Sequence, residues 1–225
     1  MGFLGDVIEW LTDSAHWWGD FGILARLREH ALLSIAATAL ALVLAFPPAF
    51  WLGHLRRGGG WAVNAGNVAR AVPSLAVLLI AVQVLGLAEW PLVGSVPALI
   101  TLVALAVAPI LTNTYVAVSE VGDGVRESAI AVGMTGMQRA VRVELPLALP
   151  VAVGGLRTAA VQVVATATIA ALVGAGGLGR FIVDGIATRD FPQTFAGALL
   201  VALLALATEA AFALVMRRLG RGARR

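Results

Sequence analysis

The fold is decided by apolar stretches such as residues 95–118, which read SVPALITLVALAVAPILTNTYVAV and contain no charged side chain. A helix needs about 20 mostly apolar residues to cross the hydrocarbon core of a bilayer, and this stretch is long enough. Four further stretches have the same character, and they lie at residues 31–53, 71–88, 147–173 and 195–216. The sequence therefore predicts an all-α integral membrane protein with about five core transmembrane helices.

The composition of the whole chain excludes a soluble globular enzyme. Of its 225 residues, 60% are hydrophobic and only 13% are charged, whereas a typical soluble domain is about 25% charged. The chain has no Cys, and all 16 of its basic residues are Arg, so it lacks thiolate metal sites and the Lys of a Walker A phosphate loop. Any ATP hydrolysis is expected on another chain. A metal site needs converging ligands, and none is predicted because the three histidines, His16, His30 and His54, are isolated.

Arginine placement predicts how the helices are oriented. The loops at 54–70 and 119–146 carry three Arg each and the tail at 217–225 carries five, whereas the segments on the other side carry four. Cytoplasmic loops of membrane proteins are enriched in Lys and Arg. The N-terminus is therefore expected outside the cell and the C-terminus in the cytoplasm. Membrane topology, rather than nucleic-acid binding, explains these Arg residues.

The N-terminal segment has the pattern of a surface helix. Residues 2–18 place apolar side chains at helical spacings with acidic side chains between them, which is typical of an amphipathic helix at a membrane interface. We therefore divide the chain into an N-terminal outer-surface segment at 1–29, a transmembrane domain at 30–216 and a basic cytoplasmic tail at 217–225.

Two charged residues fall inside predicted spans, namely Arg157 and Glu209. An ionisable residue within a span indicates either pairing or function. At 1.5 Å per residue, both lie roughly 12–15 Å from the cytoplasmic ends of their helices. This similar depth predicts an ion pair between the last two spans.

A glycine-rich stretch also follows the fourth span. Gly174, Gly176 and Gly179 match the spacing of a dinucleotide-binding fingerprint, but that site requires a preceding strand within a soluble βαβ unit. Here the glycines follow a long apolar stretch. We interpret them, together with Gly177, as a flexible outer turn between the last two spans.

The loop at 119–146 carries the most informative pattern in the chain. Glu127-Ser128-Ala129 is followed after three residues by Gly133, and after nine more by Val143-Glu144-Leu145-Pro146. We expect a short helix at 124–132 and then a tight reversal, because glycine adopts positive φ without steric cost.

The remainder of this loop is expected to complete a rigid protrusion that another protein can grip. Met137, Val141 and Val143 are predicted to pack a second helical turn beneath the bundle. Pro146 is predicted to end this piece before the fourth span, because proline interrupts helices.

The spaced pattern resembles the E-A-A, three residues, G, nine residues, I-x-L-P signature of permease subunits of bacterial ABC importers. Ser128 replaces the usual Ala, and Val143 replaces the usual Ile. Further segments are similar to the glycine betaine/carnitine/choline branch and spread the resemblance over roughly residues 30–215. These segments are Pro73–Ala76, Asn113–Tyr115, Glu144–Pro150, Gly155–Ala159 and Gly174–Gly179.

This resemblance implies a type I ABC importer transmembrane fold in a bacterial cytoplasmic membrane. The chain would form the translocation path by alternating access and would perform no catalysis. It implies two ABC ATPase subunits, a second permease subunit and an external substrate-binding protein as partners, with ATP and Mg on the ATPase and no cofactor on this chain. The residues implied in ATPase coupling are Glu127, Ser128, Ala129, Gly133, Val143, Leu145 and Pro146. The residues implied in an outer gate turn are Gly174, Gly176, Gly177 and Gly179.

Three alternatives stay open at this point. Methionine permeases share several of the quoted segments, so the solute could be methionine or another small organic molecule instead of a quaternary-amine osmoprotectant. An ATP-independent secondary carrier would need internal repeats, and no clear repeat is present. A membrane scaffold that only recruits partners would transport nothing. The sequence also leaves a homodimer and a heterodimer of permeases equally open.

Overall fold

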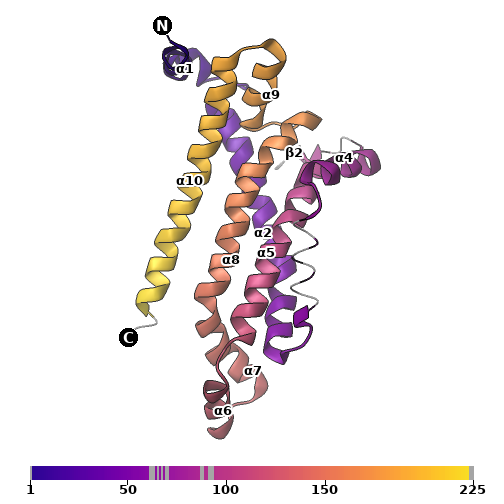
Figure 1. Ribbon diagram of the computed structural model, residues 1–225, viewed down its shortest axis with the longest axis vertical. Coiled ribbons are helices and arrows are strands. Elements are labelled where there is room, and N and C mark those ends of the chain that lie inside the picture. The colour runs from indigo at the N-terminus through magenta and orange to yellow at the C-terminus, as the bar shows by residue number, and fades with distance from the viewer. Residues whose placement is uncertain are drawn as a thin grey trace.

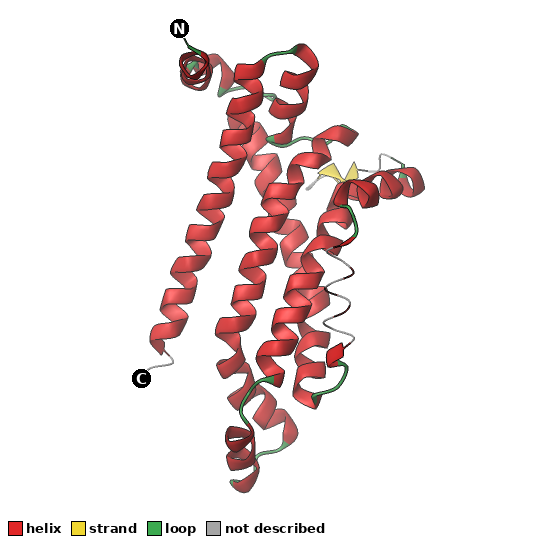
Figure 2. Cartoon of the chain, in the orientation of Figure 1, coloured by secondary structure: helices red, strands yellow, loops and turns green. Residues whose placement is uncertain are grey.

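The computed structural model describes residues 2–60, 64, 66, 68, 71–86, 89–90 and 94–222. Helices dominate the described chain, and two short antiparallel strands pair Glu89 with Ser95 (Figure 2). The elements are α1 (Phe3–Thr12), the 3-10 turn η1 (Ser14–His16), α2 (Ile23–Leu55), α4 (Ser74–Leu85), β1 (Glu89–Trp90), β2 (Gly94–Ser95), α5 (Val96–Ser119), α6 (Asp123–Ala131), α7 (Gly136–Arg139), the π-helical η2 (Ala140–Glu144), α8 (Leu145–Thr166), the 3-10 η3 (Ala167–Val173), α9 (Gly179–Thr188) and α10 (Phe191–Gly222).

Four helical segments of the described chain are long and apolar enough to cross a membrane. They are Ile23–Leu55, Val96–Ser119, Gly136–Val173 and Phe191–Arg218. Figure 1 shows them running along the long axis of the molecule, with α6 beyond one end and α1 and α9 at the other. We call these the α6 end and the α9 end. The expected all-α membrane fold is confirmed.

The predicted span at 71–88 takes a shorter form than expected. Its described part is α4, a 12-residue helix from Ser74 to Leu85, and residues 87–88 lie outside the described residues. At 1.5 Å per residue this helix is about 18 Å long, well short of the roughly 30 Å hydrocarbon core. Pro73 caps its start and Gly86, with φ of 65°, ends it. Figure 1 shows α4 roughly perpendicular to the long helices, projecting to one side near the α9 end.

Helix α5 forms the centre of the bundle, between α2 and α8. Leu102, Ala106 and Ile110 of α5 are almost completely buried. Helix α2 meets α5 with a stripe of small residues spaced four apart, Ala37, Ala41, Ala45 and Ala49, each at most 1% exposed. Small residues let helix backbones approach closely where lipid supplies no hydrophobic driving force between helices.

Two glycines mark the closest approaches to α5. A Cβ atom built on Gly53 of α2 would lie 2.8 Å from the Cβ of Val118. A Cβ atom on Gly155 of α8 would lie 2.5 Å from the Cβ of Asn113 and 2.9 Å from the carbonyl oxygen of Pro109. At both sites, helix packing therefore leaves no room for a side chain.

The N-terminal helix α1 packs on the bundle by its apolar face. Its buried residues are Val7 and Trp10, and the Trp10 ring packs in a T-shaped arrangement with Phe181 of α9, at a centroid distance of 5.4 Å. Helix α2 then begins at Ile23, so the last part of the predicted segment 1–29 already belongs to the first long helix.

The last helix extends beyond the predicted span at both ends. α10 runs from Phe191 to Gly222, whereas the span was expected at 195–216. Most of the predicted tail at 217–225 is therefore a continuation of this helix, and residues 223–225 lie outside the described residues.

The close contact between α5 and α8 predicts that two neighbouring glycines differ in how far they tolerate a side chain. Gly155→Ala should lower the melting temperature of the purified protein, because overpacking a tight contact costs about 1–3 kcal/mol. Gly154→Ala is the matched control, since among the described residues its added Cβ would meet only the end of Met216, at an ordinary 3.9 Å. Thermal unfolding in detergent measures both variants, and equal melting temperatures would contradict this description of the α5–α8 contact.

Candidate functional site

The region between α5 and α8 forms two short helices joined by a glycine turn. The helix expected at 124–132 is α6, Asp123–Ala131. Gly133 follows with φ of 80°. Its N–H donates to the carbonyl oxygen of Ile130 (2.9 Å), and the Met134 N–H donates to that of Ala129 (3.1 Å). Helices commonly end on such a left-handed glycine, so the chain reverses here as the sequence indicates.

The first three predicted coupling residues lie on α6 with different exposure. Glu127 and Ser128 are exposed, and Ala129 is buried. The Ser128 hydroxyl donates to the carbonyl oxygen of Gly124 (2.7 Å), whereas the Glu127 carboxylate has no ion-pair or hydrogen-bond partner within the described parts of the chain. This face of α6 is therefore free to meet another molecule.

The predicted break at Pro146 is wrong, because one helix runs continuously from Gly136 to Val173. Pro146 is exposed in the first turn of α8, and Val143 and Leu145 are half-buried beside it. A π-helical turn, Ala140–Glu144, precedes the proline. Proline is tolerated at the start of an α-helical segment, and this change of hydrogen-bonding pattern places Pro146 at such a start.

The predicted packing of Met137 and Val141 beneath the bundle is also wrong. Met137 is 60% exposed and Val141 is 49% exposed, because the inward side of this helix is occupied by the buried residues Ala140 and Glu144. Three more large apolar side chains are exposed on α6 and the turn after it. We call the five together the apolar end surface: Val125, Ile130, Val132, Met137 and Val141.

Glu144 is the centre of this region, although the sequence pattern indicated no role for it beyond a position in the motif. Its carboxylate is completely buried. One oxygen, Oε2, accepts a hydrogen bond from Nδ1 of His54 in α2 (2.6 Å). The other, Oε1, accepts one from Nε of Arg139 in α7 (3.1 Å) and lies 3.4 Å from Nε of Arg126 in α6. A carboxylate is only an acceptor, so His54 carries its proton on Nδ1.

Arg126 joins this cluster to the ends of two long helices. Its Nη2 donates to the carbonyl oxygen of Val118 in α5 (2.7 Å), and its Nη1 donates to that of His54 in α2 (3.2 Å). These carbonyls belong to helix C-termini, where positive charge is stabilising. Burial lowers the pKa of the Arg126 guanidinium, and the Glu144 carboxylate opposes that shift.

We call His54, Arg126, Arg139 and Glu144 the buried charge cluster. It ties α6 and α7 to the long helices α2 and α5, so charged groups hold α6 to the bundle. On the surface, Arg56 adds a further tie, since it pairs with Asp123 and donates to the carbonyl oxygen of Val121 (2.9 Å).

The two charged residues predicted inside the spans lie against each other. Nε of Arg157 in α8 donates to Oε2 of Glu209 in α10 (2.7 Å), and Nη2 pairs with the second carboxylate oxygen. Both side chains remain about one-third exposed. This bidentate geometry is the strong form of an arginine–carboxylate pair.

The glycine-rich turn at the α9 end is held by the start of α2. Gly174 and Gly177 have φ of 81° and 90°, which explains the choice of glycine at these two positions. The Gly177 N–H donates to Oε2 of Glu29 (2.7 Å). Gly176 faces the same carboxylate, and Gly179 begins α9 packed against the backbone of Thr168.

The three histidines lie in separate environments. His16 contacts the carbonyl oxygen of Trp10 (2.8 Å), His30 contacts that of Val164 (2.9 Å), and His54 belongs to the buried charge cluster. The described residues hold no group of three side chains that could bind a metal ion.

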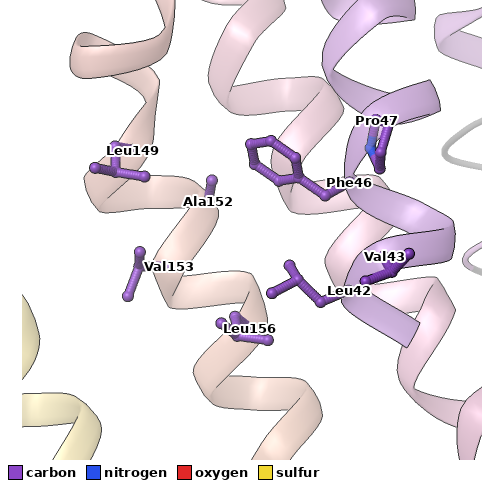
Figure 3. A pocket seen from close by; sticks show the side chains of 8 residues that line it. All are labelled: Leu42, Val43, Phe46, Pro47, Leu149, Ala152, Val153 and Leu156. Atoms are coloured by element: carbon purple, nitrogen blue, oxygen red, sulfur yellow. The ribbon is translucent and has the colours of Figure 1, made fainter. Parts of the chain in front are cut away.

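An apolar cavity of about 440 Å³ separates α2 from α8 (Figure 3). Phe46 and Leu42 of α2 point toward Leu156 and Ala152 of α8 across it. Its wall is almost entirely hydrocarbon, so this cavity can accept lipid or another helix but offers no polar group to bind a charged solute.

Comparison with known proteins identifies what this architecture is similar to. Residues 37–224 match the family model described as "Binding-protein-dependent transport system inner membrane component". A glycine betaine/carnitine/choline transport system permease protein of Bacillus subtilis is 33% identical over 196 residues, covering 87% of this chain and 88% of that protein. An osmoprotectant import permease protein of Salmonella typhimurium is 34% identical over 209 residues, covering 91% of this chain and 92% of that protein.

A solved structure shares the fold. An inward-facing conformation of the MetNI methionine ABC transporter superposes with a TM-score of 0.71 at 22% identity, covering 88% of this chain and 95% of that one. Together with the four apolar helices, these matches establish a multi-pass membrane protein.

The buried charge cluster predicts that replacing Glu144 by Ala destabilises the protein much more than replacing Glu127 by Ala. Glu144→Ala should destabilise the protein by about 3–5 kcal/mol, because removing one partner leaves buried charges uncompensated. The matched control is Glu127→Ala on exposed α6, where a change within about 0.5 kcal/mol is expected. Thermal unfolding in detergent compares the two, and a Glu144→Ala protein as stable as the control would show that the cluster does not hold α6 in place.

Proposed function

Because the chain belongs to the family of binding-protein-dependent transport system inner membrane components, we propose that it is the membrane-spanning permease subunit of an ATP-driven importer. Its solutes are quaternary-amine osmoprotectants such as glycine betaine, carnitine or choline. The observation that carries this proposal is the set of relatives with those printed solutes, which are 33–36% identical over 87–88% of this chain.

The same observation ranks the methionine alternative lower. The methionine transporter is 22% identical, and a likeness at that level supports the fold without supporting the solute. The osmoprotectant permeases are closer in sequence over a comparable share of the chain.

The α6 end is the cytoplasmic end in this proposal. Arg56, Arg126, Arg139 and Arg142 lie on the elements gathered there, and cytoplasmic segments are rich in Arg. The N-terminal helix α1 and the turn at 174–179 then face the outside, where an external binding protein delivers the solute.

Two ABC ATPase subunits, which carry the ATP and Mg, dock on α6 of this chain and of a second permease. The apolar end surface and the unpartnered Glu127 supply the contact, since exposed apolar patches mark interaction sites. The chain itself performs no bond chemistry. Its role is a conformational change. The solute crosses by alternating access as packed helices rock between two arrangements.

The buried charge cluster gives this motion a physical route. Glu144, Arg126 and Arg139 hold α6 and α7 against the ends of α2 and α5. A displacement of α6 by the ATPase therefore reaches the long helices directly. The predicted coupling residues Glu127 to Gly133 shape the lever, and the glycine turn at 174–179 is the proposed outer gate.

The lever predicts that Gly133→Val uncouples ATP hydrolysis from transport. The left-handed φ of Gly133 strains any other residue, so α6 should lose its orientation, and uptake should fall about tenfold or more while the protein remains inserted. Gly122→Val is the matched control, because Gly122 has an ordinary negative φ and no atom of the described residues lies within 4 Å of the added Cβ. Uptake of labelled glycine betaine by the reconstituted complex measures both, and normal uptake by Gly133→Val would count against the lever.

The function itself is tested by gentle purification followed by uptake assays. An ATPase should co-purify with the wild-type chain, and ATP-dependent uptake of labelled glycine betaine should be inhibited by unlabelled carnitine or choline. Stronger inhibition by methionine than by carnitine or choline would indicate that the chain is a methionine permease. Uptake that survives ATP depletion with the ion gradient held would indicate a secondary carrier, and no uptake of any solute would indicate a scaffold.

A further inference from the structure

A hollow with charged and polar side chains in its wall lies between α8 and α10, in the middle of two apolar spans. Its volume is about 490 Å³, which is within the usual range for small-molecule sites. The lining includes Gly154, Arg157, Thr158, Gln162, Ala165 and Glu209. We call it the mid-span hollow.

The position of these polar groups is unusual for a membrane helix. Polar and ionisable residues within spans almost always face a bundle interior or a water-filled cavity. The neighbouring hollow of about 360 Å³ between α2, α8 and α10 is apolar along most of its wall, with Ile35, Leu204 and Phe212 among its residues. The polar groups of α8 are therefore gathered on one face instead of being spread around the helix.

Gln162 is the observation that points to a ligand. Its side chain is half-buried and has no hydrogen-bond partner among the residues that the structure describes. A side-chain amide in the middle of a membrane span costs free energy when it has no hydrogen-bond partner. It therefore requires water, a solute or another chain in the hollow.

The neighbouring groups also keep unused hydrogen-bonding capacity. Arg157 directs Nε and Nη2 to Glu209. Among the residues that the structure describes, Nη1 has only the weak acceptor Sδ of Met216, at 3.8 Å. Thr158 lies one helical turn from Gln162, is exposed, and donates to the carbonyl oxygen of Gly154 (3.1 Å). Its hydroxyl oxygen remains able to accept a hydrogen bond.

We propose that the mid-span hollow is a solute-contact site on the translocation path, and that it takes a small zwitterion. The solute's carboxylate would accept hydrogen bonds from Arg157 and the Gln162 amide, and its cationic group would lie toward Glu209. This inference rests on the proposed importer function, and it adds the residues that meet the solute inside the membrane.

The charge arrangement favours a zwitterion over a simple ion. Arg157 and Glu209 compensate each other in the absence of solute. A net cation or anion matches only one member of this pair and leaves the other without a partner, so choline should bind here less tightly than glycine betaine. A zwitterion brings both signs and keeps the hollow neutral. A quaternary ammonium group donates no hydrogen bond, so proximity to one carboxylate is all that it requires.

The first experiment uses the natural absence of cysteine in this chain. Thr158→Cys is compared with Thr208→Cys, a matched threonine on α10 that also donates to the carbonyl oxygen four residues earlier but lines the apolar hollow. Leu206→Cys, 63% exposed on α10, serves as a lipid-facing control. Each variant is assembled with its ATPase in lipid nanodiscs and treated with a charged, membrane-impermeant thiol reagent.

Thr158→Cys should be labelled at least tenfold faster than both controls, and glycine betaine should slow its labelling. Labelling no faster than that of Thr208→Cys in both the ATP-bound and nucleotide-free states would overturn the proposal. Protection by methionine but not by glycine betaine would support the hollow as a zwitterion site while rejecting the proposed osmoprotectant solute. The two proposals therefore fail separately.

The second experiment measures transport by a Gln162→Leu variant. The KM for glycine betaine should rise roughly tenfold, because a hydrogen bond to a charged group is lost, whereas choline, which has no carboxylate, should be affected much less. Thr208→Val is the control. An unchanged KM for glycine betaine would overturn the assignment of Gln162, and so would loss of permease pairing in native mass spectrometry, since a second chain would then fill the hollow.

The third measurement separates a solute contact from a merely structural ion pair. The double variant Arg157→Glu with Glu209→Arg preserves the pair but reverses its direction. It should insert and assemble, and it should lose at least tenfold in glycine betaine uptake. Wild-type uptake by this variant would show that the pair only joins α8 to α10. If the variant does not assemble, Arg157→Lys replaces it, and an unchanged ratio of glycine betaine to choline uptake would then overturn the proposal.

Discussion

A carboxylate that is fully removed from water must be surrounded by groups that compensate it, and Glu144 imposes this requirement on the α6 end. His54, Arg126 and Arg139 meet it from three different elements. Because those partners converge on one pair of oxygens, the orientation of α6 relative to the long helices is determined. Arg126 extends the constraint by donating to carbonyl oxygens in the last turns of α2 and α5. A short surface helix, which would be marginal alone, thereby becomes a rigid attachment to the bundle.

The long helices supply a different kind of rigidity. Their contacts are made by small residues, with the alanine stripe of α2 and Gly155 of α8 pressed against α5. In lipid, such close backbone packing replaces the hydrophobic effect as the source of helix association. Helix α10 stands apart from this packing, since only 6% of its most apolar stretch is buried, compared with 61% for α5. Its tie to α8 at mid-span is the Arg157–Glu209 pair.

These two arrangements fit the division of labour in an importer permease. The charged attachment of α6 can transmit a displacement of α6 to the long helices through its hydrogen bonds and ion pairs. The loosely packed side, between α8 and α10, contains the polar groups that a charged solute needs. The apolar cavity between α2 and α8 lacks such groups. In the proposed mechanism, motion therefore enters at the α6 end, and the solute is recognised in the middle of the membrane.

The sequence by itself determined the membrane class, the positions of the long spans and the reversal at Gly133, because these follow from local hydrophobicity and backbone freedom. It overestimated the length of the helix at 71–88, and it placed a break at Pro146 and a buried side for Met137 and Val141. The errors at Pro146, Met137 and Val141 share one cause, since the π-helical turn and the inward direction of Glu144 depend on partners distant in the chain. Only the tertiary structure decided that Glu144 meets Arg126, Arg139 and His54, and that Gln162 faces a hollow. Burial and pairing arise between helices, and no spacing within one helix encodes them.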